Sequence, residues 1–240
     1  MSTSIMDKIV EATDVAEEGD RIGGFQVWPS GLYKTTIDQA FMTISSGGAI
    51  GLAVTFKNDK GNIYKETFWV VNKKGKTFWE RDGVKHNIPG FNQAKHLCLL
   101  TTGKTLEQLK PTVETKVINE RNWETGEMGQ AKVDMVMGLL DTEVNIGILS
   151  TVVDKNIKDD NNNWVPSGET REQNEIDKFF DSETNRTYSE IKAGKEEPEF
   201  AAEWANNWKG KTKNKAKGLP GAGNAPATGG AQPATKSLFS

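Results

Sequence analysis

The sequence predicts a mainly β protein, and three features carry that prediction. Residues 31–71 are rich in Thr, Val, Ile and aromatic residues, with breaks at Ser46-Gly47-Gly48 and at Asp59-Lys60-Gly61-Asn62, which is typical of a three-stranded meander. A segment with helical spacing comes next, and further β-rich segments follow it. This is the order of an oligonucleotide-binding (OB) fold, so we expect an OB-fold-like five-stranded barrel with one inserted helix. The same order also fits SH3-like or ferredoxin-like alternatives.

The second strand of the meander has the clearest pattern. Its apolar residues alternate with small or polar ones, which is the period of a strand with one buried face. These apolar residues are Ile50, Leu52, Val54 and Phe56. The third strand places Tyr64, Phe68 and Val70 on one face and Ile63, Trp69 and Val71 on the other. One face of the third strand must therefore expose aromatic area or be covered by another element.

The inserted helix follows Pro89-Gly90 and ends at Gly103. Its apolar residues Phe91, Ala94, Leu97, Cys98 and Leu100 have near-helical spacing. We expect Cys98 to be a small core residue. Further strands are predicted at 113–119 and within 136–156, separated by a turn at 123–126.

The chain divides into four predicted regions. They are an acidic N-terminal arm at 1–20, the OB-like barrel at 21–156, a ribbon and amphipathic helix at 157–208, and a disordered tail at 209–240. The helix carries Phe200, Trp204 and Trp208 at every fourth position, and we expect this stripe to pack on the barrel. The tail has six lysines and no acidic residue, then a Gly/Pro/Ala run, and ends with Leu238-Phe239 before the last residue. Such a composition cannot bury enough apolar surface to fold, so we expect a tether that presents Leu238 and Phe239 to a partner protein.

Composition argues against several classes of protein. The longest apolar runs fall far short of the roughly 20 residues that a membrane helix needs, and the N-terminus has no signal-peptide pattern, so we expect a cytoplasmic protein. One cysteine and two histidines cannot supply a disulfide framework or a zinc-type cluster. No phosphate-binding loop, GxSxG, HExxH or CxxC motif occurs, so we expect neither an enzyme nor a metal or other cofactor.

Aromatic and basic residues are interleaved along the predicted barrel, which is the combination that holds single-stranded nucleic acid. Bases stack on aromatic faces while cations contact the phosphates. The segment KKGKTFWER alone puts four cations and two large aromatics within nine residues. The candidate nucleic-acid-binding residues are Tyr33, Lys34, Tyr64, Lys65, Trp69, Lys73, Lys74, Lys76, Phe78, Trp79, Arg81, Arg121 and Trp123.

Several segments together resemble the single-stranded DNA-binding proteins that bacteriophages encode for their own replication. They are GLYKTTIDQAF, IGLAVTFKNDKGNIYKETFWV, GLLDTEVNIGIL, NEIDKFFDSETNRTYSEI and the KGKTKNKAKG run before the tail. The resemblance spans about residues 25–217 and implies an OB fold. It also implies binding without sequence preference, protection of exposed strands, and recruitment of replication or recombination proteins through the tail. The tail departs from that family, because it is basic and then neutral where the usual tail is acidic.

Two other functions fit the sequence. Residues 1–208 hold 24 basic and 33 acidic residues, a net charge of −9, which favours a protein–protein adaptor or virion component that binds no nucleic acid. Such a protein would pair the lysines around Gly75 with acids. A carboxylate-based metal nuclease is the third alternative. The oligomeric state stays open, a homo-oligomer included.

Overall fold

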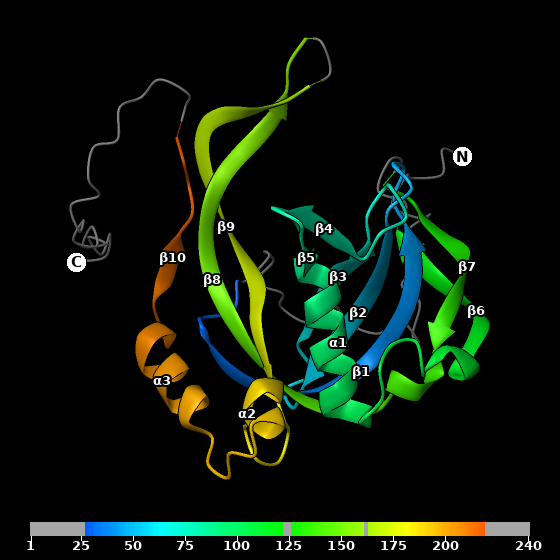
Figure 1. Cartoon of the computed structure of the whole chain (residues 1–240). Coiled ribbons are helices and arrows are strands. Elements are labelled where there is room, and N and C mark those ends of the chain that lie inside the picture. Colours follow the sequence, from blue (N-terminus) through cyan, green and yellow to red (C-terminus); the bar gives the residue numbers. More distant parts are fainter. Residues whose placement is uncertain (1–26, 122–125, 161–162, 219–240) are drawn as a thin grey trace, which may run out of the picture.

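The protein is mainly β, and its computed structural model describes residues 27–121, 126–160 and 163–218. Most strands belong to one large, mostly antiparallel sheet (Figure 1). Its strands are β1 (Gly31–Ile44), β2 (Ile50–Asn58), β3 (Ile63–Val71), β6 (Val113–Arg121), β7 (Met128–Val136), β8 (Glu143–Lys158), β9 (Trp164–Phe180) and β10 (Thr212–Asn214). A separate hairpin consists of β4 (Phe78–Arg81) and β5 (Val84–Asn87). The α-helices are α1 (Pro89–Thr102), α2 (Tyr188–Lys192) and α3 (Glu199–Trp208), and short 3₁₀ turns lie at Lys110–Thr112 and Met137–Leu139.

Strand β1 is the centre of the sheet. One edge pairs with β2, while the other edge pairs first with β8 and then, near Phe41, with β7. Strand β9 pairs with β8 along most of its length, and these two strands form a long arm that extends beyond the rest of the molecule (Figure 1). The hairpin β6–β7 packs on the outer face of β1 through Phe41, Val133 and Met135.

The predicted mainly β fold is confirmed; the sheet has eight strands, and no backbone ladder in the described ranges closes it into the predicted five-stranded barrel. Strands β3 and β9 approach each other, but in the described ranges side chains rather than a backbone ladder connect them. The carboxylate of Glu66 on β3 accepts hydrogen bonds from the backbone N–H of Ile176 on β9, at 3.0 Å, and from the hydroxyl of Tyr64, at 2.8 Å. Burial raises the pKa of the Glu66 carboxyl, although both hydrogen bonds act in the opposite direction.

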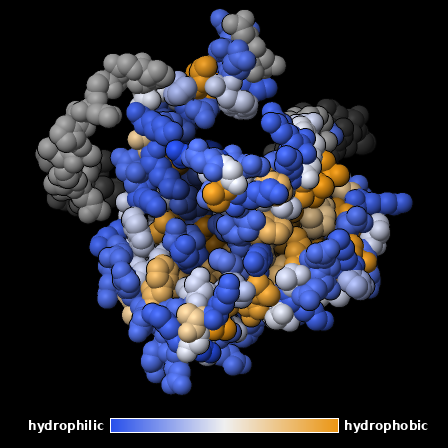
Figure 2. All heavy atoms as spheres, viewed as in Figure 1, coloured by the Kyte–Doolittle hydropathy of each residue, from blue (hydrophilic) through white to orange (hydrophobic). Residues whose placement is uncertain are grey.

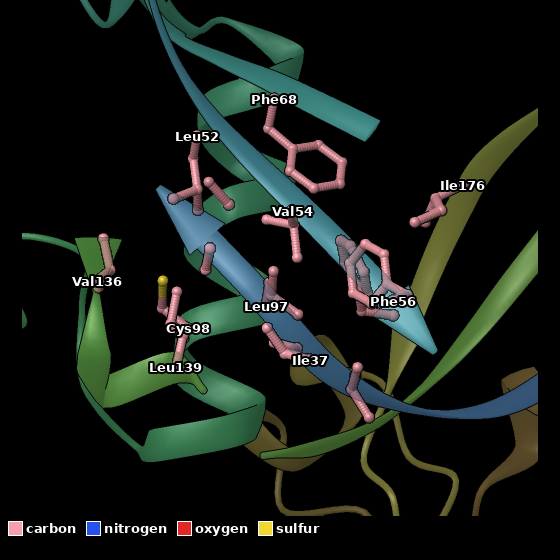
Figure 3. Close-up of a cluster of buried hydrophobic side chains, with 14 of the residues drawn as sticks. Ile37, Leu52, Val54, Phe56, Phe68, Leu97, Cys98, Val136, Leu139 and Ile176 are labelled. Carbon is pink, nitrogen blue, oxygen red and sulfur yellow. The ribbon is translucent and has the colours of Figure 1, made fainter. Parts of the chain in front are cut away.

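Helix α1 packs against the inner face of the sheet, where the main core lies (Figure 3). The predicted alternation of β2 is confirmed, because Leu52, Val54 and Phe56 are all buried. Burying each such side chain contributes about 1.5–3 kcal/mol. From α1, Leu97 and Cys98 complete this core, and burial raises the pKa of the Cys98 thiol to about 12.

Two glycines fix the ends of α1. A Cβ at Gly90 would lie 2.5 Å from the carbonyl oxygen of Trp69, so only glycine lets the helix begin this close to β3. Gly103 ends the helix with φ 68°, and its N–H donates to the carbonyl of Leu99. The helix predicted between Pro89 and Gly103 is therefore confirmed.

Helix α3 covers the outer face of β8 and β9, as its aromatic stripe predicts. Trp204 is 3% exposed and packs against Phe180 and Leu149. Its indole N–H donates to the carboxylate of Asp177 at 2.8 Å. Ile176, which lies within the ribbon predicted from residue 157, is a buried residue of β9.

Two elements were not predicted from the sequence: the hairpin that contains Phe78 and Trp79, and strand β7. The disorder predicted from residue 209 onward is wrong for residues 209–218, which are described and contain β10. The boundary at residue 156 stays a prediction, and β8 runs across it. The arm at 1–20 and residues 219–240 lie outside the described ranges.

No helix within these ranges is long and apolar enough to span a membrane.

Candidate nucleic-acid interface

Among the predicted site residues that the structure describes, the hairpin β4–β5 carries the most exposed aromatic group. Its two-residue turn is Asp82-Gly83, with φ 53° and 75°, which matches the twist of the flanking strands. Trp79 is 44% exposed, and its ring stacks on His86 with centroids 4.6 Å apart and planes at 24°. One face of the indole is thus supported by the hairpin itself.

Cations surround the second aromatic residue of the hairpin. The ammonium groups of Lys76 and Lys85 lie 5.6 Å and 5.0 Å from the ring centroid of Phe78. Both distances are in the range of a cation–π contact. Lys85 and His86 were not predicted, although the Asp-Gly pair that precedes them is a strong hairpin signal. That turn places Lys85 opposite Glu80 and His86 opposite Trp79.

The turn between β3 and β4 presents three lysines to solvent. The side-chain oxygen of Asn72 accepts the backbone N–H groups of Lys74 and Lys76, at 2.9 Å and 3.1 Å, and so fixes the turn. Within the described part of the chain, no carboxylate forms an ion pair with Lys73, Lys74 or Lys76. Their charges are therefore available to an anionic ligand. Arg81 differs, because its guanidinium lies 3.4 Å from the carboxylate of Asp82.

The outer face of β3 continues from this turn. Lys65 is exposed and Trp69 is 42% exposed. Gly51 on β2 makes room for this indole, since a Cβ there would lie 3.0 Å from Trp69 Cε3 and 2.6 Å from Thr67 Cγ2. The sequence required one aromatic face of β3 to be either exposed or covered by another element. The face that carries Trp69 is partly exposed.

A shallow groove of about 180 Å³ lies beside Lys65 on this face. Strands β1, β2 and β3 form its floor, and residues 118–120 of β6 form its wall. The backbone of Arg121 continues β6 past this wall. The side chain of Arg121 and the whole of Trp123 lie outside what the structure describes.

The remaining predicted residues lie at the other end of β3. Tyr33 and Tyr64 flank Trp28, with ring centroids 4.9 Å and 6.2 Å away. Trp28, which was not predicted, exchanges two backbone hydrogen bonds with the Asn174 side chain, at 2.7 Å and 2.8 Å. Lys34 forms an ion pair of 2.9 Å with Glu143, and this contact raises the Lys34 pKa.

Tyr64 is half-buried and its hydroxyl is engaged inside the protein. Its hydroxyl donates to Glu66 and contacts the carbonyl oxygen of Asn174, at 2.8 Å and 3.2 Å. Burial raises its pKa, and the neighbouring Glu66 charge adds to this effect.

The predicted residues thus form two groups. The larger runs from Lys65 through Trp69 to the turn and hairpin. The smaller contains Tyr33, Lys34 and Tyr64 beside a cavity of about 740 Å³. The smaller group lies at the start of β3, a nine-residue strand about 30 Å long, whereas the larger group begins next to it at Lys65 and continues past the end of the strand. The predicted partner-binding residues Leu238 and Phe239 lie outside the described ranges.

Neither a protein-family model nor a curated protein sequence matches this chain significantly.

Proposed function

We propose that this chain binds single-stranded DNA without sequence preference in phage DNA replication or recombination. The observation that carries the proposal is the half-exposed indole of Trp79 next to a turn whose three lysines have no acidic partner in the described chain. An aromatic face and unpaired cations are the two devices that hold a single strand. Binding of this kind involves no covalent chemistry, so the proposed function is not enzymatic.

The path of the strand follows from the arrangement of the larger group. Bases would stack on Trp69, Phe78 and Trp79, while Lys65 and the turn lysines contact phosphates. Stacking contributes about 1–3 kcal/mol per base for any base type, because every base has a π face. Figure 2 shows an open gap between the arm formed by β8 and β9 and the region of β4 and β5. A flexible DNA strand would reach the hairpin through this gap.

We further propose that β1, β2, β3, β8 and β9 correspond to the five strands of an OB fold. The support is their order, β1 to β3, then α1, then β8 and β9, with β8 beside β1; the hairpins β4–β5 and β6–β7 are insertions before and after α1. The sequence of antiparallel pairs makes β9 run parallel to β3. The bridge from Glu66 to Ile176 would then lie where the barrel closes.

A partner would recognise Leu238 and Phe239 at the end of the chain. The proposed partners are replication or recombination proteins in the cytoplasm of the phage host. Deleting residues 238–240 is expected to leave DNA affinity unchanged and to impair replication in vivo. Unchanged replication would remove this docking role.

An adaptor that binds no nucleic acid is the second candidate. It is favoured by an apolar cavity of about 650 Å³ lined by Ile50, Val71, Phe91 and Leu106, among others. Hydrophobic residues gather in this part of the surface, near α1 and β2 (Figure 2). The adaptor hypothesis also requires acidic partners for the lysines around Gly75, and the described residues supply none.

Intrinsic tryptophan fluorescence tests the proposal, because the chain contains seven tryptophans. We expect oligo-dT to quench the fluorescence, and we expect the quenching to weaken as salt rises. No change at low salt with micromolar protein would reject DNA binding and favour the adaptor.

A further inference from the structure

The segment after α3 places lysine at every second position. These residues are Lys209, Lys211, Lys213, Lys215 and Lys217. Residues 212–214 form β10, and Lys209 lies before a turn at Gly210, whose φ is 70°. The segment therefore presents five cations along β10 and its two flanks, which we call the lysine ladder.

Backbone contacts hold the ladder against β8. Strand β10 pairs with β8 in parallel, with Lys213 opposite Thr151. On the N-terminal side of β10, the N–H of Gly210 donates to the carbonyl of Ser30 at 2.9 Å, and the hydroxyl of Ser30 donates to the carbonyl of Lys211 at 2.6 Å. Ser30 is itself 3% exposed, so the ladder is anchored to the folded domain.

The C-terminal end of the ladder is anchored as well. The N–H of Lys215 donates to the carbonyl of Val152 at 2.8 Å. The carboxylate of Asp154 accepts the N–H groups of Lys217 and Gly218, at 2.9 Å and 3.1 Å. The backbone positions of the lysines are thus set before any ligand arrives.

Few of the ladder charges are neutralised. Lys215 forms an ion pair of 2.6 Å with Glu175, and the ammonium group of Lys213 lies 5.1 Å from the ring centroid of Trp208. Lys209, Lys211 and Lys217 are exposed and have no ion pair among the described residues. Holding five like charges in place with few counter-charges is unfavourable, and an anionic ligand would relieve that repulsion.

We propose that the lysine ladder is a second binding track for the phosphate backbone of single-stranded DNA. The inference rests on the proposed function, but it concerns a separate surface. Strands β10 and β3 lie at opposite ends of the path β10-β8-β1-β2-β3 through the sheet, and the interface hairpin follows β3 (Figure 1). Cations that are anchored along one strand and its flanks suit one extended sugar-phosphate backbone, which carries a negative charge at every nucleotide. A DNA strand that binds to both surfaces must pass around the arm formed by β8 and β9.

Lysine acetylation, read by mass spectrometry, tests the ladder directly on the full chain. We would compare free protein with complexes of oligo-dT of about 8 nucleotides, which is within the site size of about 4–16 nucleotides for one OB fold, and of about 30 nucleotides, which is well above it. We expect the short strand to protect Lys73, Lys74 and Lys76, and the long strand to protect Lys209, Lys211 and Lys217 as well. Protection of the turn lysines alone at both lengths would overturn the ladder and leave the proposed function standing. Protection of neither set would overturn both.

A charge-matched pair of variants gives a second measurement. K209Q/K211Q/K217Q removes the three unpaired lysines and keeps every backbone contact of the segment. K104Q/K132Q/K192Q removes three exposed lysines elsewhere, and both variants change the net charge of −3 by the same amount. With the long strand, each lost phosphate contact should lower the slope of log K against log salt by about 0.7, or about 2 in total. The control should keep the wild-type slope, and equal slopes in the two variants would contradict the ladder.

Discussion

The carboxylate of Glu66 on β3 accepts a hydrogen bond from the backbone N–H of Ile176 on β9, at 3.0 Å. One side chain therefore bridges two strands that lie 110 residues apart in the sequence. Gln93 of α1 also binds the backbone of Ile176, because its side-chain N–H donates to the Ile176 carbonyl at 3.0 Å. The seam between β3 and β9 depends on these side chains.

Removing the Glu66 bridge should destabilise the fold. Glu66→Ala leaves the N–H of Ile176 without its acceptor, so we expect a loss of about 1–3 kcal/mol in the free energy of unfolding. Glu66→Gln keeps an acceptor oxygen and should cost less than Glu66→Ala. Urea denaturation of both variants at neutral pH checks this order. Equal stability of Glu66→Ala and wild type would show that the seam holds without the bridge.

The difference in stability between wild type and Glu66→Gln should also depend on pH. The folded protein has a raised Glu66 pKa, so between the unfolded and folded pKa values it binds a proton that the unfolded chain has released. Wild type should therefore lose stability relative to Glu66→Gln as pH rises through this window. Denaturation at several pH values from 4 upward measures the difference. A difference that does not change with pH would contradict the raised pKa.

Replacing Trp79 should weaken binding to all single strands alike. Trp79→Ala removes one stacking platform worth about 1–3 kcal/mol, which is about 5- to 150-fold in affinity. Fluorescence anisotropy with labelled dT, dA and mixed oligonucleotides measures the change. Val84→Ala on the same hairpin is the control, because Val84 is 55% exposed but has no ring. A loss confined to particular sequences would contradict stacking.

Adding a methyl group beneath Trp69 should disturb the outer face of β3. Gly51→Ala puts a Cβ too close to both Thr67 and Trp69, so we expect a shifted indole and several-fold weaker DNA binding. Overpacking of this kind costs about 1–3 kcal/mol of stability. The double variant G51A/T67S relieves the Thr67 contact alone, and it should recover stability more than affinity. If Gly51→Ala binds DNA as tightly as wild type, Trp69 does not belong to the interface.

Removing the turn lysines should reduce the salt dependence of binding. K73Q/K74Q/K76Q should lower the slope of log K against log salt by about 2 for a short oligo-dT, since each phosphate contact contributes about 0.7. The variant K104Q/K132Q/K192Q again supplies the charge-matched control. An unchanged slope in the turn variant would show that other cations hold the phosphates.

Local hydrophobic patterns in the sequence predicted much of this fold, because apolar residues at regular spacing mark the face of an element that is buried. The alternation in β2 and the spacing in α1 and α3 each mark one apolar face, and those faces are buried in the structure. Strand β10 escaped prediction because its residues are polar and backbone contacts hold it. Strand β7 was missed although Ala131, Val133 and Met135 alternate in it.

The candidate site was harder to predict for a different reason. The contacts of Trp69 with Gly51 and of Trp28 with Asn174 join distant parts of the chain, and no local pattern encodes them. The turn lysines and Trp79, by contrast, lie within nine residues, so their proximity could be predicted from the sequence.

The environment of Cys98 has a practical consequence for studying this chain. It is the sole thiol in the sequence, it is fully buried, and its pKa of about 12 leaves almost no reactive thiolate at neutral pH. A cysteine introduced at an exposed position such as Val84 would then be the main site of maleimide labelling, with the native cysteine left in place. Fluorophores or spin labels on the hairpin and the arm could report their separation as a strand binds.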